Sequence, residues 1–288
     1  MQLSYLNWRE SCCNLARFEG HLSVLTVIPA RLGATRLPRK PLRLLGGVPL
    51  VVRVYERVKS LNVGDACVVA TDEVEVLDVC ASHAVPAVLT SNLHRSGTDR
   101  VAEVASRAEY LQHQFILNVQ GDEPFITRDA LNAAVLGVTG GKAGVGTVCV
   151  AAADEILKRP DIVKVVRTSD GLALYFSRAP IPYLRDNAEL DVLQSLVRQH
   201  IGVYAYSRPA LMQWVGLQPH PLELVERLEQ LRPLAHGIRI AVADVAEAPE
   251  RGIDTAEDLE RANARWHQFE SHASHDAFLT LTPTPSTA

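Results

Sequence analysis

The sequence predicts an α/β protein with a mostly parallel sheet and helices on both faces. Through the first half of the chain, short apolar runs rich in Val and Ile alternate with longer amphipathic stretches. This alternation is typical of βαβ units, whose parallel strands are buried on both faces by the connecting helices. With 288 residues, 47% of them hydrophobic, the chain is long enough for one large domain of this kind.

The elements of the first half follow from this alternation. Strands are expected at residues 23–28, 66–70, 86–89 and 115–119. Helices are expected at residues 50–59, 74–82, 97–107 and 128–136. Because parallel sheets bind ligands beyond the carboxyl ends of their strands, the loops after these strands are the expected place for a site.

The pattern changes after about residue 144, where strand-like runs follow one another with few helices between them. These runs are residues 145–151, 161–178 and 200–207. The dipeptide Asp170-Gly171 lies inside the second run and is a hairpin signal, so antiparallel strands are expected in this half. Helices are expected again at 208–215, 221–231 and 255–269, with a strand at 238–243.

A single folded domain is expected over residues 23–270. Residues 1–22 are interpreted as an extension outside the fold, and residues 271–288, rich in Ser, Thr and Pro near their end, as a disordered tail. The sequence contains no apolar run of membrane-helix length and no signal-peptide pattern, which predicts a cytoplasmic protein without membrane insertion. Its five cysteines show no C-x-x-C spacing, so reduced thiols are expected rather than disulfides or zinc.

A cluster of positive charge follows the first expected strand, although the net charge of the chain is −4. The cluster consists of Arg31, Arg36, Arg39, Lys40 and Arg43. The overall charge argues against binding to a nucleic acid and favours a small anion. The loop is either a phosphate cradle or an exposed basic loop, and it matches neither the Walker A nor the G-x-G-x-x-G pattern.

Carboxylates follow another strand of the same sheet. Asp122 and Glu123 come directly after residues 115–119, at the edge where the basic loop is expected. They can hold Mg²⁺ against substrate phosphates, or they can belong to a local turn. Acidic and basic side chains at the same edge of the sheet favour a site that binds a metal ion together with phosphate groups.

Two further acids lie close to expected helix starts. Asp254 precedes Thr255, the expected N-cap of the last helix, and has no capping role of its own, so it is a weak candidate for a second metal ligand. Asp72 follows the second strand and is interpreted as the N-cap of the next helix, with ligand contact as the alternative.

The remaining polar residues exclude several enzyme classes. The ten histidines show no metal-ligand spacing, and no G-x-S-x-G or H-E-x-x-H motif is present, which excludes serine-hydrolase and zinc-protease chemistry. Arg178 and His200 lie among apolar residues, and each alone is interpreted as a residue with a structural partner.

Taken together, these segments resemble the 3-deoxy-manno-octulosonate (KDO) cytidylyltransferase family, also called CMP-KDO synthetases. The resemblance extends over about residues 23–265. The matching segments, in family order, are VIPARLGATRLPRKPL, VVATD, HRSGTDRVAEV, NVQGDEPFI, VKVV, ALYFSRAPIPY, RQHIGVYAY, PLELVERLEQLR and GIDTAEDLERA.

The resemblance implies the fold of nucleotide-diphospho-sugar transferases and a reaction in which CTP and KDO give CMP-KDO and pyrophosphate. It further implies Mg²⁺ as cofactor, a role in lipopolysaccharide biosynthesis and a homodimer. It implies catalytic roles for Arg31 and Lys40 on the CTP phosphates, and metal binding by Asp122 and Asp254. It assigns the nucleotide to Ala30, Arg31, Lys40, Asp72, Ser96, Gly97, Thr98 and Gln120, and the acid sugar to Arg178, His200, Tyr204, Glu229 and Gln230.

One residue of the basic loop departs from the family pattern, because Arg39 stands where the family commonly has glycine. The rival hypotheses are a cytidylyltransferase for 8-amino-KDO or a sialic acid, a non-catalytic nucleotide sensor, and an RNA-binding protein. Both metal carboxylates, Arg31 and Lys40 are present, which disfavours the sensor. The net charge and the absence of aromatic stacking motifs disfavour RNA.

Overall fold

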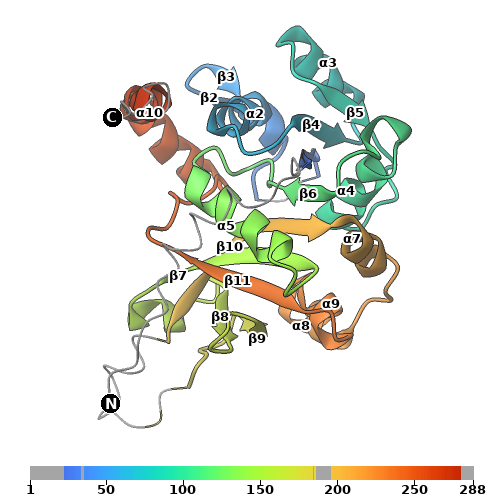
Figure 1. Ribbon diagram of the computed structural model, residues 1–288. Coiled ribbons are helices and arrows are strands. Elements are labelled where there is room, and N and C mark those ends of the chain that lie inside the picture. Colours follow the sequence, from blue (N-terminus) through green and yellow to red (C-terminus); the bar gives the residue numbers. More distant parts are fainter. Residues whose placement is uncertain (1–22, 34–35, 184, 186–195, 280–288) are drawn as a thin grey trace, which may run out of the picture.

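In the computed structural model, the described residues form a central sheet of nine strands that is covered by helices (Figure 1). The structure describes residues 23–33, 36–183, 185 and 196–279. The expected N-terminal extension and residues 280–288 of the expected tail lie outside the described residues, as do Cys12 and Cys13.

The parallel half of the sheet has the strand order β6–β1–β4–β5. Its strands are β1 (Val24–Ala30), β4 (Ala66–Thr71), β5 (Ala87–Leu89) and β6 (Phe115–Asn118). β1 pairs in parallel with both β4 and β6, so these neighbours lie on opposite sides of it. All seven residues of β1 are buried, as the apolar run predicts for a strand covered on both faces.

The other half of the sheet continues from β6 in the order β10–β7–β11. Its strands are β7 (Val145–Ala151), β10 (Arg198–Ser207) and β11 (Ile240–Val245). β10 is antiparallel to both β6 and β7, whereas β11 is parallel to β7. The hairpin signal is also confirmed: β8 (Lys164–Arg167) and β9 (Ala173–Ser177) pair antiparallel, and Gly171 between them has φ +86°.

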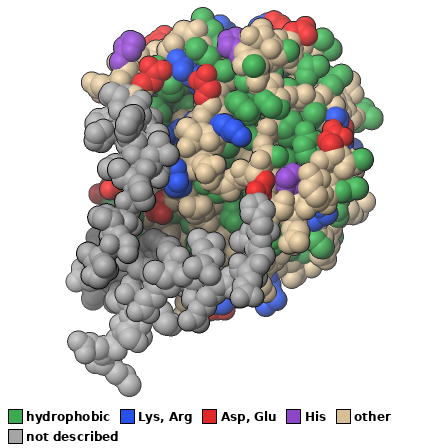
Figure 2. All heavy atoms as spheres, turned by 45° about the horizontal axis from the view of Figure 1, so that its top comes forward, with side chains coloured by type: hydrophobic (Ala, Val, Ile, Leu, Met, Phe, Trp, Pro, Cys, Tyr) green, Lys and Arg blue, Asp and Glu red, His purple; other side chains and the backbone are tan. Residues whose placement is uncertain are grey.

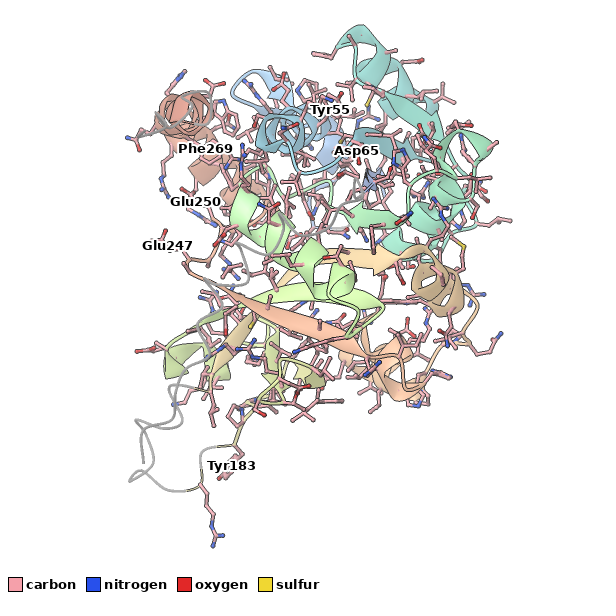
Figure 3. The ribbon with its side chains drawn as sticks, in the orientation of Figure 1. Tyr55, Asp65, Tyr183, Glu247, Glu250 and Phe269 are labelled. Carbon is pink, nitrogen blue, oxygen red and sulfur yellow. The ribbon has the colours of Figure 1, made fainter. Side chains whose placement is uncertain are left out.

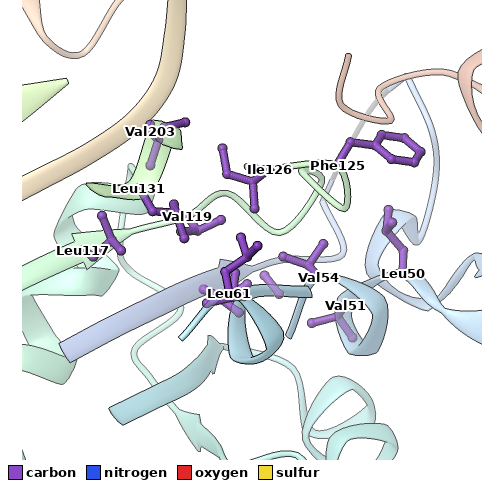
Figure 4. Close-up of a cluster of buried hydrophobic side chains, with 14 of the residues drawn as sticks. Leu50, Val51, Val54, Leu61, Leu117, Val119, Phe125, Ile126, Leu131 and Val203 are labelled. Atoms are coloured by element: carbon purple, nitrogen blue, oxygen red, sulfur yellow. The ribbon is translucent and has the colours of Figure 1, made fainter. Parts of the chain in front are cut away.

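The helices divide between the two faces of the sheet. One hydrophobic cluster joins the sheet to α2 (Leu50–Leu61), α3 (Val74–Ser82), α5 (Arg128–Thr139) and α10 (Ala256–Leu279). Figure 4 shows part of this cluster, in which Val54 and Leu61 of α2 approach Ile126 and Val119. A second cluster joins the sheet to α4 (Gly97–Ala105), α7 (Arg208–Val215) and α9 (Leu231–Ala235).

Two elements differ from the sequence prediction. The helix expected over 221–231 is divided into α8 (Pro221–Glu226) and α9 at Arg227, which takes the left-handed conformation with φ 53°. The buried Glu223 and Arg232 side chains form an ion pair across this break, with Nη2 and Oε1 2.5 Å apart. The last helix continues to Leu279, into the segment expected as a tail.

A short hairpin follows the basic loop and was not expected. It consists of β2 (Leu44–Leu45) and β3 (Val48–Pro49), joined by Gly46 and Gly47, which both have positive φ. It lies against α10, where the Asn263 side chain accepts from Gly46 N and donates to Leu44 O. The hairpin therefore links the basic loop to the C-terminal helix.

Candidate functional site

A pocket of about 420 Å³ lies at the carboxyl ends of β1 and β6. After β1 the chain adds β4 and β5 on one side of β1, and it then returns to form β6 on the other side. The loops after β1 and β6 therefore separate and leave a crevice between them. Ligands typically bind in such a crevice of a parallel sheet. We call this cavity the β1–β6 pocket. It is lined by Pro29, Ala30, Arg31, Gly33, Arg36, Lys40, Pro41, His94, Ser96, Gly97, Arg100, Gln120, Gly121, Asp122, Glu229 and Asp254.

Lys40 connects the basic loop to both candidate metal carboxylates. Its Nζ lies 2.6 Å from Asp122 Oδ2 and 2.8 Å from Asp254 Oδ1. Burial lowers the pKa of Lys40, but the Asp122 and Asp254 carboxylates outweigh this effect and raise it. Arg36 Nη2 lies 3.1 Å from Asp254 Oδ2, so this arginine belongs to the same cluster.

The backbone before Lys40 is set by Arg39, which has φ 57° although it is not glycine. Arg39 forms an ion pair with Glu75 on α3, and its carbonyl accepts from Leu42 N in the turn that begins at Lys40. Arg43 donates from Nε to Pro38 O. Neither Arg39 nor Arg43 lines the pocket.

Glycine is required where the β6 loop approaches β1. A Cβ atom on Gly121 would lie 2.8 Å from Pro29 O, closer than such atoms approach in proteins. The absence of a side chain therefore allows Asp122 to follow directly at the mouth of the pocket.

The start of α4 forms another wall of the pocket. Ser96 is its N-cap, with Ser96 Oγ accepting from Asp99 N and Asp99 Oδ2 accepting from Ser96 N. Ser96 and Gly97 line the pocket together with Gln120 from the β6 loop. Free backbone N–H groups at a helix start favour an anionic group.

Glu229 also lines the pocket. Its Oε2 accepts from Thr98 Oγ1 at 2.9 Å. Burial raises the pKa of Glu229, and the Thr98 hydrogen bond reduces this rise. Of the residues that the resemblance assigns to the acid sugar, Glu229 is the one that reaches this pocket.

The other residues assigned to the sugar lie outside the pocket lining. The Arg178 guanidinium donates to the backbone oxygens of Glu226 and Pro160, each at 3.0 Å. His200 is packed against Phe176 and bonded to Thr147, and burial lowers its pKa to about 3.

Tyr204 and Gln230 are both buried. The Tyr204 hydroxyl is one of the buried polar atoms of the described residues without a hydrogen-bond partner. Gln230 is the N-cap residue of α9 and follows Glu229 directly. The structure thus leaves the assignment of these residues to the sugar as a prediction.

The N-cap interpretation of Asp72 is wrong. α3 begins after Glu73, and Asp72 Oδ2 instead lies 2.8 Å from Arg100 Nη2. Arg100 is 3% exposed and lines the pocket, so its buried charge requires a carboxylate partner. Asp72 therefore supports the pocket through Arg100 rather than lining it. The capping of the last helix by Thr255, in contrast, is confirmed, because Thr255 Oγ1 accepts from Asp258 N.

The carboxylate pair fits a magnesium ion that also binds substrate. The described residues contain no group of three or more His, Cys, Asp or Glu side chains arranged to hold a metal. Asp122 and Asp254, however, both direct an oxygen at the single Lys40 cation. Mg²⁺ commonly takes one or two protein carboxylates and completes its shell with water and substrate phosphates.

Comparisons with known proteins identify the family of the chain. A family model described as cytidylyltransferase matches residues 25–240. The 3-deoxy-manno-octulosonate cytidylyltransferase of Gemmatimonas aurantiaca is 63% identical over 245 residues, which are 85% of this chain and 95% of that protein. The protein of the same name from Polynucleobacter asymbioticus is 46% identical over 82% of this chain and 93% of its own length.

The chain belongs to the 3-deoxy-manno-octulosonate cytidylyltransferase family. A solved structure of this kind, CMP:2-keto-3-deoxy-manno-octonic acid synthetase complexed with CTP, is 38% identical and has a TM-score of 0.78 over 86% of this chain and 99% of the other. The 4-diphosphocytidyl-2C-methyl-D-erythritol synthase of Anaerococcus prevotii shares the fold. It is 13% identical and has a TM-score of 0.56 over 85% of this chain and 98% of the other.

Several pocket residues of this family member were not assigned from the sequence. His94 lines the pocket and lies 2.5 Å from Glu103 Oε2 through its Nε2, and Arg100 pairs with Asp72 as described. Both lie in the segment HRSGTDR, which the resemblance included without giving them roles. The available signal, not used above, was an arginine inside the amphipathic pattern of this helix, because a charge on the buried face of a helix needs a carboxylate partner.

The charge distribution agrees with a site for a small anion. On the face shown in Figure 2, Lys and Arg side chains are scattered among acidic and apolar ones and form no continuous basic surface. Among the described residues, no helix is both long and apolar enough to span a bilayer.

Proposed function

We propose that this chain transfers the CMP unit of CTP to the acid sugar KDO, giving CMP-KDO and pyrophosphate. The observation that carries the proposal is the convergence of Lys40, Asp122 and Asp254 in one pocket with the start of α4. Family membership at 63% identity to a protein of that name supports the choice of both substrates.

The reaction is an in-line attack of the anomeric hydroxyl of KDO on the α-phosphorus of CTP, with pyrophosphate as the leaving group. Such transfers depend mainly on positioning and on stabilising negative charge. Arg31 and Lys40 bind the phosphates and stabilise the charge that develops on them. The start of α4 and Gln120 orient the nucleotide, and Ala30 lies beside it at the end of β1.

We further propose Mg²⁺ as the cofactor, held by Asp122 and Asp254 together with the phosphates. When bound, it neutralises phosphate charge and polarises the reacting oxygens. Lys40 then moves its ammonium from the carboxylates toward the triphosphate, because its flexible stem lets it exchange one anionic partner for another.

Pyrophosphate release tests the function. The purified chain is incubated with CTP, Mg²⁺ and, separately, KDO, 8-amino-KDO or a sialic acid. We expect release with KDO. Pyrophosphate release with a sialic acid alone would refute KDO as the substrate. No release with any of the three sugars would refute the proposed enzymatic activity. Omission of Mg²⁺ or addition of EDTA tests the cofactor.

We propose a homodimer in the cytoplasm whose product supplies lipopolysaccharide biosynthesis, as the resemblance implies. Several large apolar side chains near β9 and α8 are solvent-exposed, which favours an interface there. They are Leu174, Tyr183, Leu224 and Val225, and Tyr183 extends away from the body of the protein in Figure 3. Light scattering tests this assembly, and a monomer mass at micromolar concentration would contradict it.

A further inference from the structure

His94 lines the β1–β6 pocket, and the proposed function assigns it no role. It lies in the loop between β5 and α4, and its side chain is 21% exposed. Its Nε2 lies 2.5 Å from Oε2 of Glu103, a residue of α4. Among the described residues, no polar group pairs with the other ring nitrogen, Nδ1. One nitrogen of this histidine is therefore held by α4, and the other is available to a ligand.

Glu103 fixes which ring nitrogen carries the proton. A carboxylate accepts hydrogen bonds and donates none, so Nε2 is the N–H donor of this contact. Burial raises the pKa of Glu103, but the hydrogen bonds that it accepts, first among them the one from Ser91 N, outweigh this effect and lower it. Arg107 Nη2 also donates to Oε1 of Glu103, at 3.0 Å. With Nε2 as the donor, the neutral imidazole of His94 offers the pocket a hydrogen-bond acceptor at Nδ1.

The order of the strands places His94 at the end of the pocket away from the metal carboxylates. β4 and β5 lie on one side of β1, and β6 lies on the other. Asp122 follows β6 and contacts Lys40, whereas His94 follows β5. The phosphates and the base are opposite ends of a nucleotide. Phosphates bound near Lys40 therefore leave the β4–β5 end of the pocket for the base.

Arg100 lines the same end of the pocket, but its guanidinium is already bound within the protein. Its Nη2 lies 2.8 Å from Asp72 Oδ2, and its Nη1 donates to Thr90 Oγ1. The arginine is buried, and its charge is balanced by this carboxylate. This end of the pocket thus suits a neutral group such as a base rather than another phosphate.

We propose that His94 selects cytosine over uracil by accepting a hydrogen bond at Nδ1 from the exocyclic amine of the base. Cytosine carries a donor at this position, N4–H₂, whereas uracil carries the acceptor O4. Uracil would place O4 against the lone pair of Nδ1, and both acceptors would lose water without gaining a partner. Glu103 is then a positioning residue, because it acts on the base only through the imidazole. The inference rests on the proposed function, which places CTP in this pocket.

The test is the ratio of the dissociation constants of UTP and CTP. Both are measured by calorimetry with Mg²⁺ at about pH 8, where an imidazole is ordinarily neutral. No acid sugar is added, so no CMP transfer consumes the nucleotide. For the unaltered chain we expect UTP to bind about tenfold or more weakly than CTP, because one hydrogen bond is lost and its acceptor is left unpaired. His94→Phe keeps a planar ring without a nitrogen, and we expect the ratio to fall toward 1.

A third nucleotide identifies the atom that His94 contacts. Pyrimidin-2-one ribonucleoside triphosphate is CTP without the amine at C4. His94→Phe should weaken the binding of CTP by about fivefold or more and leave the binding of this analogue nearly unchanged. If the substitution instead weakens both nucleotides equally and spares 2′-deoxy-CTP, His94 contacts a ribose hydroxyl and the proposal is wrong.

Two further variants separate base selection from folding. His83→Phe changes an exposed histidine at the end of α3, outside the pocket lining, and should leave the ratio unchanged. Glu103→Gln replaces a group that only accepts by one that also donates, so either ring nitrogen of His94 can carry the proton and the ratio should also fall. If His94→Phe does not fold by circular dichroism, Glu103→Gln decides.

Equal dissociation constants of CTP and UTP in the unaltered chain would overturn the proposal. An unchanged ratio in folded His94→Phe, or in Glu103→Gln where the first variant does not fold, would also overturn it. Failure of the proposed function is distinguishable, because the unaltered chain would then release no pyrophosphate from CTP and KDO, whatever its preference between the two nucleotides. Normal turnover of the unaltered chain with an unchanged ratio in His94→Phe refutes the base selection alone.

Discussion

At the scale of single residues, Lys40 and its carboxylates form the charge centre of the site. Lys40 is 14% exposed and Asp122 is 28% exposed, so their attraction is only partly screened by water. In contrast, the Arg39–Glu75 pair is about half exposed at both ends and contributes little stability. The basic loop thus contains one strong electrostatic contact, Lys40–Asp122, and one weak contact, Arg39–Glu75.

We expect Asp122→Asn to lower Mg²⁺-dependent pyrophosphate release by about 100-fold or more, with the fold retained. The amide keeps the shape of the side chain but removes a charge that holds both Lys40 and the metal. Turnover measured across a Mg²⁺ titration, with circular dichroism as the folding check, tests this. Asp78→Asn, on the exposed surface of α3, is the matched control. Near-normal turnover of Asp122→Asn at all Mg²⁺ concentrations would show that Asp122 is not a metal ligand.

Two substitutions of Arg39 separate the effect of its backbone conformation from the effect of its ion pair with Glu75. Both Arg39→Val and Arg39→Asn lose the contact with Glu75, but a β-branched residue resists φ 57° whereas asparagine tolerates it. We expect Arg39→Val to cost roughly 1 kcal/mol or more in stability and to raise the KM for CTP, because Lys40 follows directly. Arg39→Asn should remain close to the unaltered chain. Equal KM values for the two variants would mean that the left-handed conformation does not position Lys40.

At the scale of elements, most of the fold was predictable because the buried strands are continuous apolar runs. The β2–β3 hairpin also had a sequence signal, since Gly46-Gly47 separates two apolar pairs. The break between α8 and α9 had none. Arg227 is an ordinary helix former, and its left-handed conformation results from the folding back of α9, which the buried Glu223–Arg232 pair holds in place.

The hairpin and the C-terminal helix meet at Gly46, where the structure leaves no room for a side chain. A Cβ on Gly46 would lie 2.1 Å from Trp266 Cδ1, whereas a Cβ on Gly47 would meet no atom within 4 Å. Both glycines have positive φ, so substitution by alanine strains the backbone in each. We expect Gly46→Ala to be less stable than Gly47→Ala by about 1–3 kcal/mol, the usual cost of overpacking.

Chemical denaturation of both variants measures this difference. Because α10 begins at Ala256, two residues after Asp254, displacement of Trp266 should also reduce turnover in Gly46→Ala more than in Gly47→Ala. Equal stabilities would indicate that α10 moves away from the hairpin without cost.

At the scale of the whole molecule, the site depends on contacts that sequence spacing does not reveal. Lys40 and Asp254 meet although 214 positions separate them along the chain. Motif spacing placed the basic loop and Asp122 at one edge of the sheet, but Asp254 was a weak signal by itself. Its place follows from the packing of α10 against β2–β3, a tertiary contact. The Asp72–Arg100 pair was missed for the same reason, because N-capping is local whereas the pair joins two elements.

The partly buried His200 makes the stability of the whole domain depend on pH. The unfolded chain protonates this histidine near its ordinary pKa of 6.5, whereas burial lowers the pKa of folded His200 to about 3. Between these values the unfolded state binds more protons, so the free energy of unfolding falls as the pH falls. The loss for one such group is at most about 1.4 kcal/mol per pH unit.

We therefore expect His200→Gln, which keeps a polar group toward Thr147 and does not take up a proton, to lose less stability than the unaltered chain between pH 6 and 4.5. The difference should reach up to about 2 kcal/mol over this interval, by the same constant. Urea denaturation at several pH values measures it, and His83→Gln, a surface substitution, should follow the unaltered chain. Parallel pH dependence in His200→Gln and the unaltered chain would mean that folded His200 protonates as readily as it does in the unfolded state.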